Sequence, residues 1–189
     1  MNAMYVIALG NVDGEALAAI ELCLWRAFGV EVRRLPPIHQ PVRAYNAQRG
    51  QYSSVEVLRA LTGMVPPDGI RLLGVTEKDL FIPMLSFVFG QAQVNGKLAV
   101  LSLARLRQEF YGLAPQGALL QARAIKEAVH EIGHTFGLTH CTDTSCPMSL
   151  SNNVRQVDHK GEEFCRNCSI MLEEHTQHIR TGNGPGEKQ

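Results

Sequence analysis

The sequence predicts an α/β fold, a mixed α+β arrangement in which helices pack on a twisted, mixed sheet. Three patterns predict it: an apolar strand followed directly by an amphipathic helix, an antiparallel hairpin near the middle of the chain, and a long helical stretch after the hairpin. With 189 residues, the chain is long enough to bury most of its apolar surface in one core. We therefore expect a single domain.

The first half of the chain opens with the strand "MYVIALG" and an amphipathic helix over residues 13–29. The run "VEVRRLPPI" alternates like a strand until Pro36 and Pro37 break it. The polar stretch "PVRAYNAQRGQ" predicts a loop that leads to the helix "SSVEVLRALTG". Ser53 is the expected N-cap of that helix, and Glu56 would complete a capping box.

The middle of the chain begins with a strand in "GIRLLGVTEKDL" and continues with two strand-like runs separated by Asn95 and Gly96, which favour a two-residue hairpin turn. Residues 116–136 have a helical pattern, and Gly137 is suited to a left-handed helix stop. Beyond it we expect loops until the short final helix "SIMLEEHTQHIR". Residues 181–189 are predicted to be a disordered tail.

The composition restricts the partners and the compartment. Eighteen basic residues balance eighteen acidic ones, and no long run of like charge occurs, so we expect no nucleic-acid partner and no membrane partner. The apolar run at residues 4–9 is too short for a signal peptide or a membrane span. These features predict a cytoplasmic protein, and a monomer is the default expectation.

The segment "HEIGHTFGLTH" predicts a catalytic metal site. His130 and His134 are four residues apart, so on a helix both rings lie on one face and can direct nitrogens at one ion. Catalytic zinc commonly has three protein ligands and an open position, and His140 can supply the third after Gly137 turns the chain. Glu131 is rotated by about 100° around the helix axis, where it can act on a water molecule as general base.

Four cysteines predict a second metal site. Cys141 and Cys146 form one close pair, and Cys165 and Cys168 form another. Two such pairs suit a closed tetrahedral zinc site that contributes folding energy. The alternative is a pair of disulfides or free thiols, which a chain without an export signal disfavours. Cys23 stands apart in the first helix and is expected to be a buried, unreactive thiol.

The two predicted sites meet at one peptide bond. His140 and Cys141 are adjacent, and neighbouring side chains in an extended segment point to opposite faces, so each can serve a different ion. We therefore expect two zinc ions per chain, one catalytic and one structural. The cysteine site would hold the loop that carries the third histidine.

These residues resemble the archaemetzincin family of metzincin zinc metallopeptidases, which continue from the third histidine into Cys-x4-Cys-x-Met and a later Cys-x-x-Cys. The match covers about forty residues, from His130 to Cys168. The resemblance implies a metzincin-like domain with N-terminal helices, an active-site helix and Met148 below the histidines. It divides the chain into residues 1–137, which hold the sheet and active-site helix, and 138–180, a small zinc-stabilised C-terminal subdomain.

The resemblance implies a metallopeptidase that hydrolyses a peptide or protein substrate lying antiparallel to the edge strand, which we place at residues 87–92. The alternative is a zinc-stabilised protein that binds a peptide without cleaving it. Glu131 favours the enzyme, because a pure scaffold needs no carboxylate beside the metal ligands. The remaining histidines are expected to be surface residues: His39, His159, His175 and His178.

Overall fold

The computed structural model describes residues 2–180, with the side chains of the last helix described as far as Thr176. The predicted tail, residues 181–189, lies outside the described residues. The strands are β1 (Ala3–Leu9), β2 (Val32–Ile38), β3 (Tyr45–Asn46), β4 (Gln51–Ser53), β5 (Gly69–Thr76), β6 (Leu80–Phe81), β7 (Gly90–Ala92) and β8 (Leu98–Ser102). The helices are α1 (Gly14–Phe28), α2 (Ser54–Leu61), α3 (Gly117–Thr135), α4 (Val154–His159) and α5 (Arg166–Arg180), with 3-10 turns at Val42–Ala44, Ala104–Leu106 and Gln108–Tyr111.

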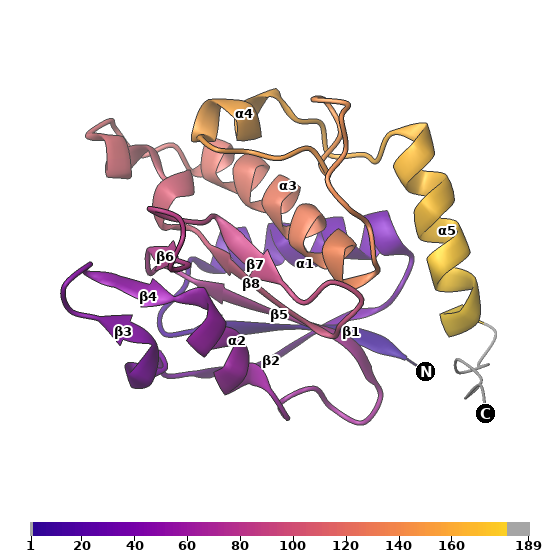
Figure 1. The fold of residues 1–189 in the computed structure, drawn as a ribbon, viewed down its shortest axis with the longest axis horizontal. Helices are drawn as coiled ribbons and strands as arrows, with labels where there is room; N and C mark the ends of the chain where they lie inside the picture. Colours follow the sequence, from indigo (N-terminus) through magenta and orange to yellow (C-terminus); the bar gives the residue numbers. More distant parts are fainter. Residues whose placement is uncertain (1, 181–189) are drawn as a thin grey trace.

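The main sheet has the strand order β2-β1-β5-β8-β7. Its first four strands are parallel, and β7 runs antiparallel to β8 at one edge. Helices α1 and α3 lie together on one face of this sheet and α2 lies on the other (Figure 1). A second small sheet, β3-β4-β6, lies beside the main sheet. The predicted α/β fold with a mixed sheet is therefore confirmed.

Strand β1 divides the interior into two cores. Its side chains alternate between the faces, as a strand requires. Met4 and Val6 join the core formed with α1 and α3, whereas Tyr5 and Ile7 join the core formed with α2. All seven residues of β1 are buried, which agrees with the continuous apolar run in the sequence.

The helix boundaries follow the capping residues. Asp13 caps α1 by accepting hydrogen bonds from the backbone amides of Glu15 and Ala16, and Gly29 ends that helix with a φ of 63°. Ser53 caps α2, as predicted, through its side-chain oxygen. The predicted capping box was wrong in its second interaction, the bond from Glu56 back to the backbone of Ser53. The carboxylate of Glu56 instead pairs with Arg59 on the next turn.

Two predictions that strand structure would be interrupted, at the prolines of β2 and in the polar stretch after it, were wrong. Strand β2 continues through Pro36 and Pro37, because it is an edge strand and their missing N–H groups deprive no neighbour of a hydrogen bond. The pairing of β2 with β1 shifts register between Ile7 and Leu9, next to these prolines. The expected polar loop contains β3 and leads into β4, and these strands pair as a short antiparallel hairpin.

The β7–β8 hairpin was predicted correctly, but not its turn. Gln93 donates its backbone N–H to the carbonyl of Leu98 at 2.9 Å, so residues 94–97 form a four-residue loop. A two-residue type I′ turn needs positive φ at both central positions. Asn95 has a φ of 56°, whereas Gly96 has no positive φ.

The region after Gly137 is more helical than predicted. Helix α4 was not expected, and α5 begins at Arg166, so that it includes Cys168. Asn153 caps α4 through its side chain, a local signal that the prediction overlooked. Residues of this region complete the core formed with α1 and α3: Cys146, Met148, Val157, Cys168 and Leu172. The division into residues 1–137 and 138–180 stays a prediction.

Within residues 2–180, no helix combines the length and apolar character that crossing a bilayer requires.

Candidate metal centres and active-site cleft

Helix α3 carries the predicted metal-binding motif on its last two turns. It ends as expected: the amide of Gly137 donates to the carbonyl of His134 at 2.9 Å, and the amide of Leu138 donates to that of Gly133 at 3.1 Å. These two bonds form a Schellman motif, in which the residue after the cap takes a left-handed conformation. Gly137 has a φ of 91°. The chain thereby reverses and returns His140 to the helix.

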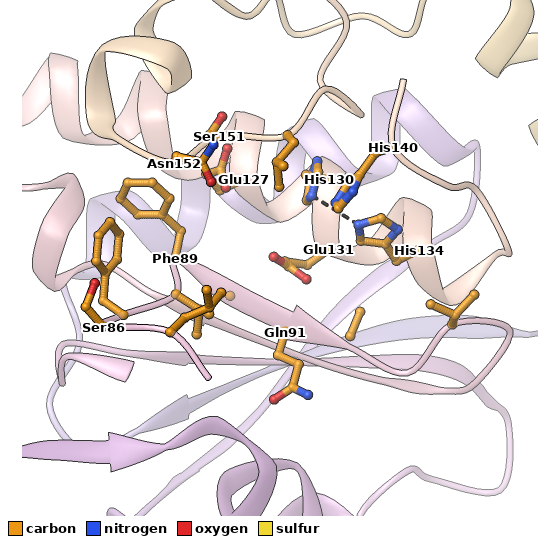
Figure 2. A pocket seen from close by; sticks show the side chains of 17 residues that line it. Ser86, Phe89, Gln91, Glu127, His130, Glu131, His134, His140, Ser151 and Asn152 are labelled. Atoms are coloured by element: carbon orange, nitrogen blue, oxygen red, sulfur yellow. Dashed lines mark hydrogen bonds between the residues drawn. The ribbon is translucent and has the colours of Figure 1, made fainter. Parts of the chain in front are cut away.

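The structure brings the three predicted histidines together. Their ring nitrogens lie within 4.8 Å of one another in His130, His134 and His140. The Nε2 atoms of His130 and His134 are 3.0 Å apart. The ring centroid of His140 lies 5.4 Å from that of His130 and 4.9 Å from that of His134. Figure 2 shows the three rings converging on one side of α3.

Hydrogen bonds determine which nitrogens face the centre of this cluster. The Nδ1 atom of His130 lies 2.8 Å from the carbonyl oxygen of Pro147, and that of His134 lies 2.7 Å from the carbonyl oxygen of Leu138. A carbonyl oxygen only accepts, so each Nδ1 must carry the proton. Burial lowers the pKa of His130 well below its usual value and lowers that of His134 as well. With the protons on the Nδ1 atoms, both Nε2 atoms can present lone pairs to the centre of the cluster.

A cation between the two Nε2 atoms would account for their close approach. Two acceptors at 3.0 Å repel each other unless a positive charge is shared. Two nitrogens at about 2.0–2.1 Å from one zinc ion, at a tetrahedral angle, are about 3.3 Å apart. The observed separation is close to this value, and the carbonyl bonds to Nδ1 are the outer contacts that metal-binding histidines commonly make. The donor set therefore fits a zinc ion.

Met148 packs directly against the helix that carries the motif. Its side chain is fully buried. A Cβ added at Gly133, between the two helical histidines, would lie only 2.5 Å from the sulfur of Met148. The thioether therefore occupies space that any side chain at position 133 would fill, on the helix turn between His130 and His134. The place of Met148 below a bound zinc ion stays a prediction.

Glu131 lies beside the histidines in a buried group of ionisable side chains. One turn earlier on the same helix face is Glu127, whose carboxylate binds the ammonium group of Lys160 at 2.8 Å. Burial raises the pKa of Glu131 well above its usual value; the nearby Glu127 carboxylate adds to the shift and Lys160 opposes it. Glu127 and Lys160 were missed by the sequence analysis, although the i, i+4 spacing of the two glutamates was a usable signal.

The four predicted cysteine ligands form a separate cluster. The sulfurs of Cys141, Cys146, Cys165 and Cys168 all lie within 4.8 Å of one another, and none forms a disulfide. A bond from the backbone amide of Cys168 lowers the pKa of Cys165, whereas burial raises the pKa of Cys146 and of Cys168. Four sulfurs at these distances can surround one tetrahedral ion.

The histidines and Glu131 line a cleft of about 470 Å³. It is lined by residues 85–92, which include the edge strand β7, by residues of α3 and by residues 150–152. Figure 2 shows Phe89 and Ser86 on the side of the sheet and Asn152 beside Ser151 and Glu127. The cleft therefore places an exposed strand edge next to the predicted metal site.

The remaining predicted surface groups lie away from this cleft. His39 is exposed. His159 ends α4 and lies 3.4 Å from the hydroxyl of Thr144, and His175 is exposed with its Nδ1 2.6 Å from the carbonyl oxygen of Phe136. The side chain of His178 lies outside the described part of the chain. Cys23 is partly buried in α1, and burial raises its pKa to about 11, which agrees with an unreactive thiol.

Comparisons with known proteins decide the family. The family model "Peptidase family M54" matches residues 32–174. The chain belongs to this family, the archaemetzincins. It is 44% identical to the archaemetzincin of Methanocaldococcus jannaschii over 88% of this chain and 90% of that one. The archaemetzincin of Methanopyrus kandleri is 46% identical over 70% of this chain and 72% of that one. The predicted resemblance is confirmed, and the chain is a metallopeptidase, which is a hydrolase.

Solved structures agree with this membership. The crystal structure of the Methanopyrus kandleri archaemetzincin superposes with a TM-score of 0.83 at 36% identity, covering 93% of this chain and 96% of that one. A zinc-dependent peptidase from Methanocorpusculum labreanum also superposes with a TM-score of 0.83, at 29% identity, covering 90% of this chain and all of that one. The predicted fold class is therefore shared with family structures.

Proposed function

We propose that the chain is a zinc-dependent peptidase whose catalytic ion is held by His130, His134 and His140. The observation that carries this proposal is the 3.0 Å separation of the Nε2 atoms of His130 and His134, whose Nδ1 atoms each face a backbone carbonyl oxygen. Three imidazole ligands leave a tetrahedral ion one open position, as in catalytic zinc sites. A bound zinc ion supplies Lewis-acid chemistry, which acidifies water and polarises a carbonyl group.

Glu131 is the proposed general base. It is the next residue after His130 on α3, and it lines the cleft. In amide hydrolysis, Glu131 would accept a proton from the attacking water and then donate it to the leaving amine, without a covalent enzyme intermediate. Its burial keeps bulk water from competing for that proton.

The substrate would be a peptide or protein segment that lies extended along β7. This strand ends the main sheet, so one side of its backbone has no partner strand within the described residues. Addition of a peptide to an exposed edge uses main-chain hydrogen bonds and leaves side chains to be selected by adjacent pockets. Phe87 and Phe89 form an apolar part of the cleft wall. We propose a monomer that needs no nucleic-acid or membrane partner.

The cysteine cluster is proposed to hold a second, structural zinc ion. Four thiolates would complete its coordination and leave no position open for a substrate. The amide of Cys141 also donates to the carbonyl of Met148 at 2.9 Å, which closes the segment between the third histidine and the methionine. We propose that the chain acts in the cytoplasm, where the four thiols of this site would stay reduced.

Digestion of a peptide library tests this function. The zinc-loaded chain is incubated with the library, and new termini are identified by mass spectrometry, with Glu131→Ala as the paired variant. We expect cleavage by the natural chain, none by the variant and equal zinc content in both. If both proteins bind library peptides and leave them intact, the chain is the zinc-stabilised peptide-binding protein that the sequence left as the alternative.

A further inference from the structure

Gly90 makes an unusually close contact with Glu131. It is the first residue of β7 and pairs with Leu101 on β8. A Cβ added at Gly90 would lie 2.6 Å from both Cγ and Oε1 of Glu131, and 2.6 Å from the carbonyl oxygen of Val100. Real Cβ atoms do not approach heavy atoms this closely, so the side chain of Glu131 occupies the space in which a side chain at position 90 would lie.

The backbone conformation at position 90 does not require a glycine. Gly90 is absent from the glycines with positive φ, so its conformation is open to any L-residue. The side chain of the next residue, Gln91, points to the other face of the sheet, where its Oε1 accepts a hydrogen bond from Ser54 of α2 at 2.6 Å. Figure 2 shows Gln91 directed away from Glu131. Position 90 therefore faces α3, and what it requires is the absence of a side chain.

We infer that Gly90 is a positioning residue for the proposed reaction, because its missing side chain sets where the carboxylate of Glu131 lies. The inference rests on the proposed role of Glu131 as general base. The side chain of Glu131 extends from α3 toward β7, the edge strand along which the substrate would lie. A methyl group at position 90 would push its Cγ and carboxylate away from that strand. A displacement of about 1 Å in a reacting group can reduce the rate roughly 10²-fold.

Kinetics of Gly90→Ala provide the first test. The matched control is Gly117→Ala at the start of α3, where an added Cβ has no heavy atom within 4 Å. On a peptide that the natural chain cleaves, we expect Gly90→Ala to lower kcat by about 10- to 100-fold, with KM and zinc content unchanged and the control like the natural chain. A kcat of Gly90→Ala equal to that of the control would overturn the inference.

A double-mutant cycle separates the contact with Glu131 from the contact with Val100, and it needs no peptidase activity. The melting temperature is measured for the natural chain, Gly90→Ala, Glu131→Ala and the double variant, all loaded with zinc. Removing the side chain of Glu131 opens the space, so we expect Gly90→Ala to lower the melting temperature less in the Glu131→Ala chain. An equal loss in both backgrounds would assign the effect to Val100 and overturn the inference.

The same four proteins still test the inference if Gly90→Ala does not fold. If Gly90→Ala fails to fold and the double variant folds, Glu131 is the group that the methyl displaces, as the inference requires. If neither folds, the backbone of β8 excludes the methyl by itself, and the inference is overturned. A natural chain that cleaves no peptide would instead count against the proposed function, while the coupling between Gly90 and Glu131 is still measured.

Discussion

His140 and Cys141 are joined by one peptide bond, yet their side chains belong to two different clusters. The ring of His140 stacks beside that of His130, with centroids 5.4 Å apart. The sulfur of Cys141 lies 3.7 Å from that of Cys165. The third proposed catalytic ligand therefore lies on a segment whose next residue is anchored in the cysteine cluster, so that a change at one cluster should affect the other.

Loss of one cysteine should disturb both clusters. Cys165→Ser removes a thiolate from the proposed structural site, and binding of zinc to such sites is worth about 10–16 kcal/mol, comparable to the stability of a whole domain. We expect this variant to lose the cysteine-bound zinc, bind the other zinc more weakly and melt at a lower temperature, as measured by elemental analysis and calorimetry. Cys23→Ser is the control and should keep both ions. Two tightly held ions in Cys165→Ser would contradict the coupling.

Replacing the carboxyl group of Glu131 with an amide should stop catalysis without removing the metal. Glu131→Gln keeps the volume of the side chain and loses the ability to accept a proton, so kcat should fall by about 10²- to 10⁴-fold. Zinc content should equal that of the natural chain, because Glu131 is not among the proposed ligands. A variant that retains more than half of the natural kcat would exclude Glu131 as the base.

The buried pair of Glu127 and Lys160 should contribute to stability as a unit. The Lys160 side chain is completely buried and that of Glu127 is 3% exposed. Lys160→Met leaves an uncompensated buried carboxylate, so the free energy of unfolding should fall by about 3–5 kcal/mol in chemical denaturation. The double variant Glu127→Leu, Lys160→Met removes both charges and should be more stable than Lys160→Met. A double variant that is no more stable would show that the charges are not coupled.

Gly137→Ala should lower the free energy of unfolding by more than the cost of placing alanine at a positive φ. A non-glycine residue at such a φ costs about 1–2 kcal/mol. Gly112, with a φ of 73° and no heavy atom within 4 Å of an added Cβ, provides the control for this strain. At Gly137 the added Cβ would also collide with Asn95 and lie 2.9 Å from Nδ1 of His175. Equal losses of unfolding free energy in Gly112→Ala and Gly137→Ala would contradict this packing.

The sequence predicted those parts of the fold and site that depend on local chemistry. The spacing of His130 and His134 on a helix, the stop at Gly137 and the cysteine pairs were all visible as short patterns, and the structure brings the corresponding side chains together. Strand β1 and helix α1 were also predicted well, because an apolar run and strong caps, Asp13 and Gly29, define them.

Features that depend on the position of a strand or a distant partner were not predicted. The prolines of β2 are tolerated only because that strand lies at an edge, which the local sequence does not reveal. Lys160 reaches Glu127 from 33 positions away in the chain. Gly90 resembled an ordinary strand residue, and its contact with Glu131 exists only because α3 packs across β7.

The central claim is that the three histidines hold a zinc ion separate from the one in the cysteine cluster. Anomalous diffraction at the zinc absorption edge, from crystals of the zinc-loaded chain, tests it most directly. We predict two peaks, one among the Nε2 atoms of His130, His134 and His140 and one among the four cysteine sulfurs. A single peak at the cysteines, with no density between the histidines, would contradict the account.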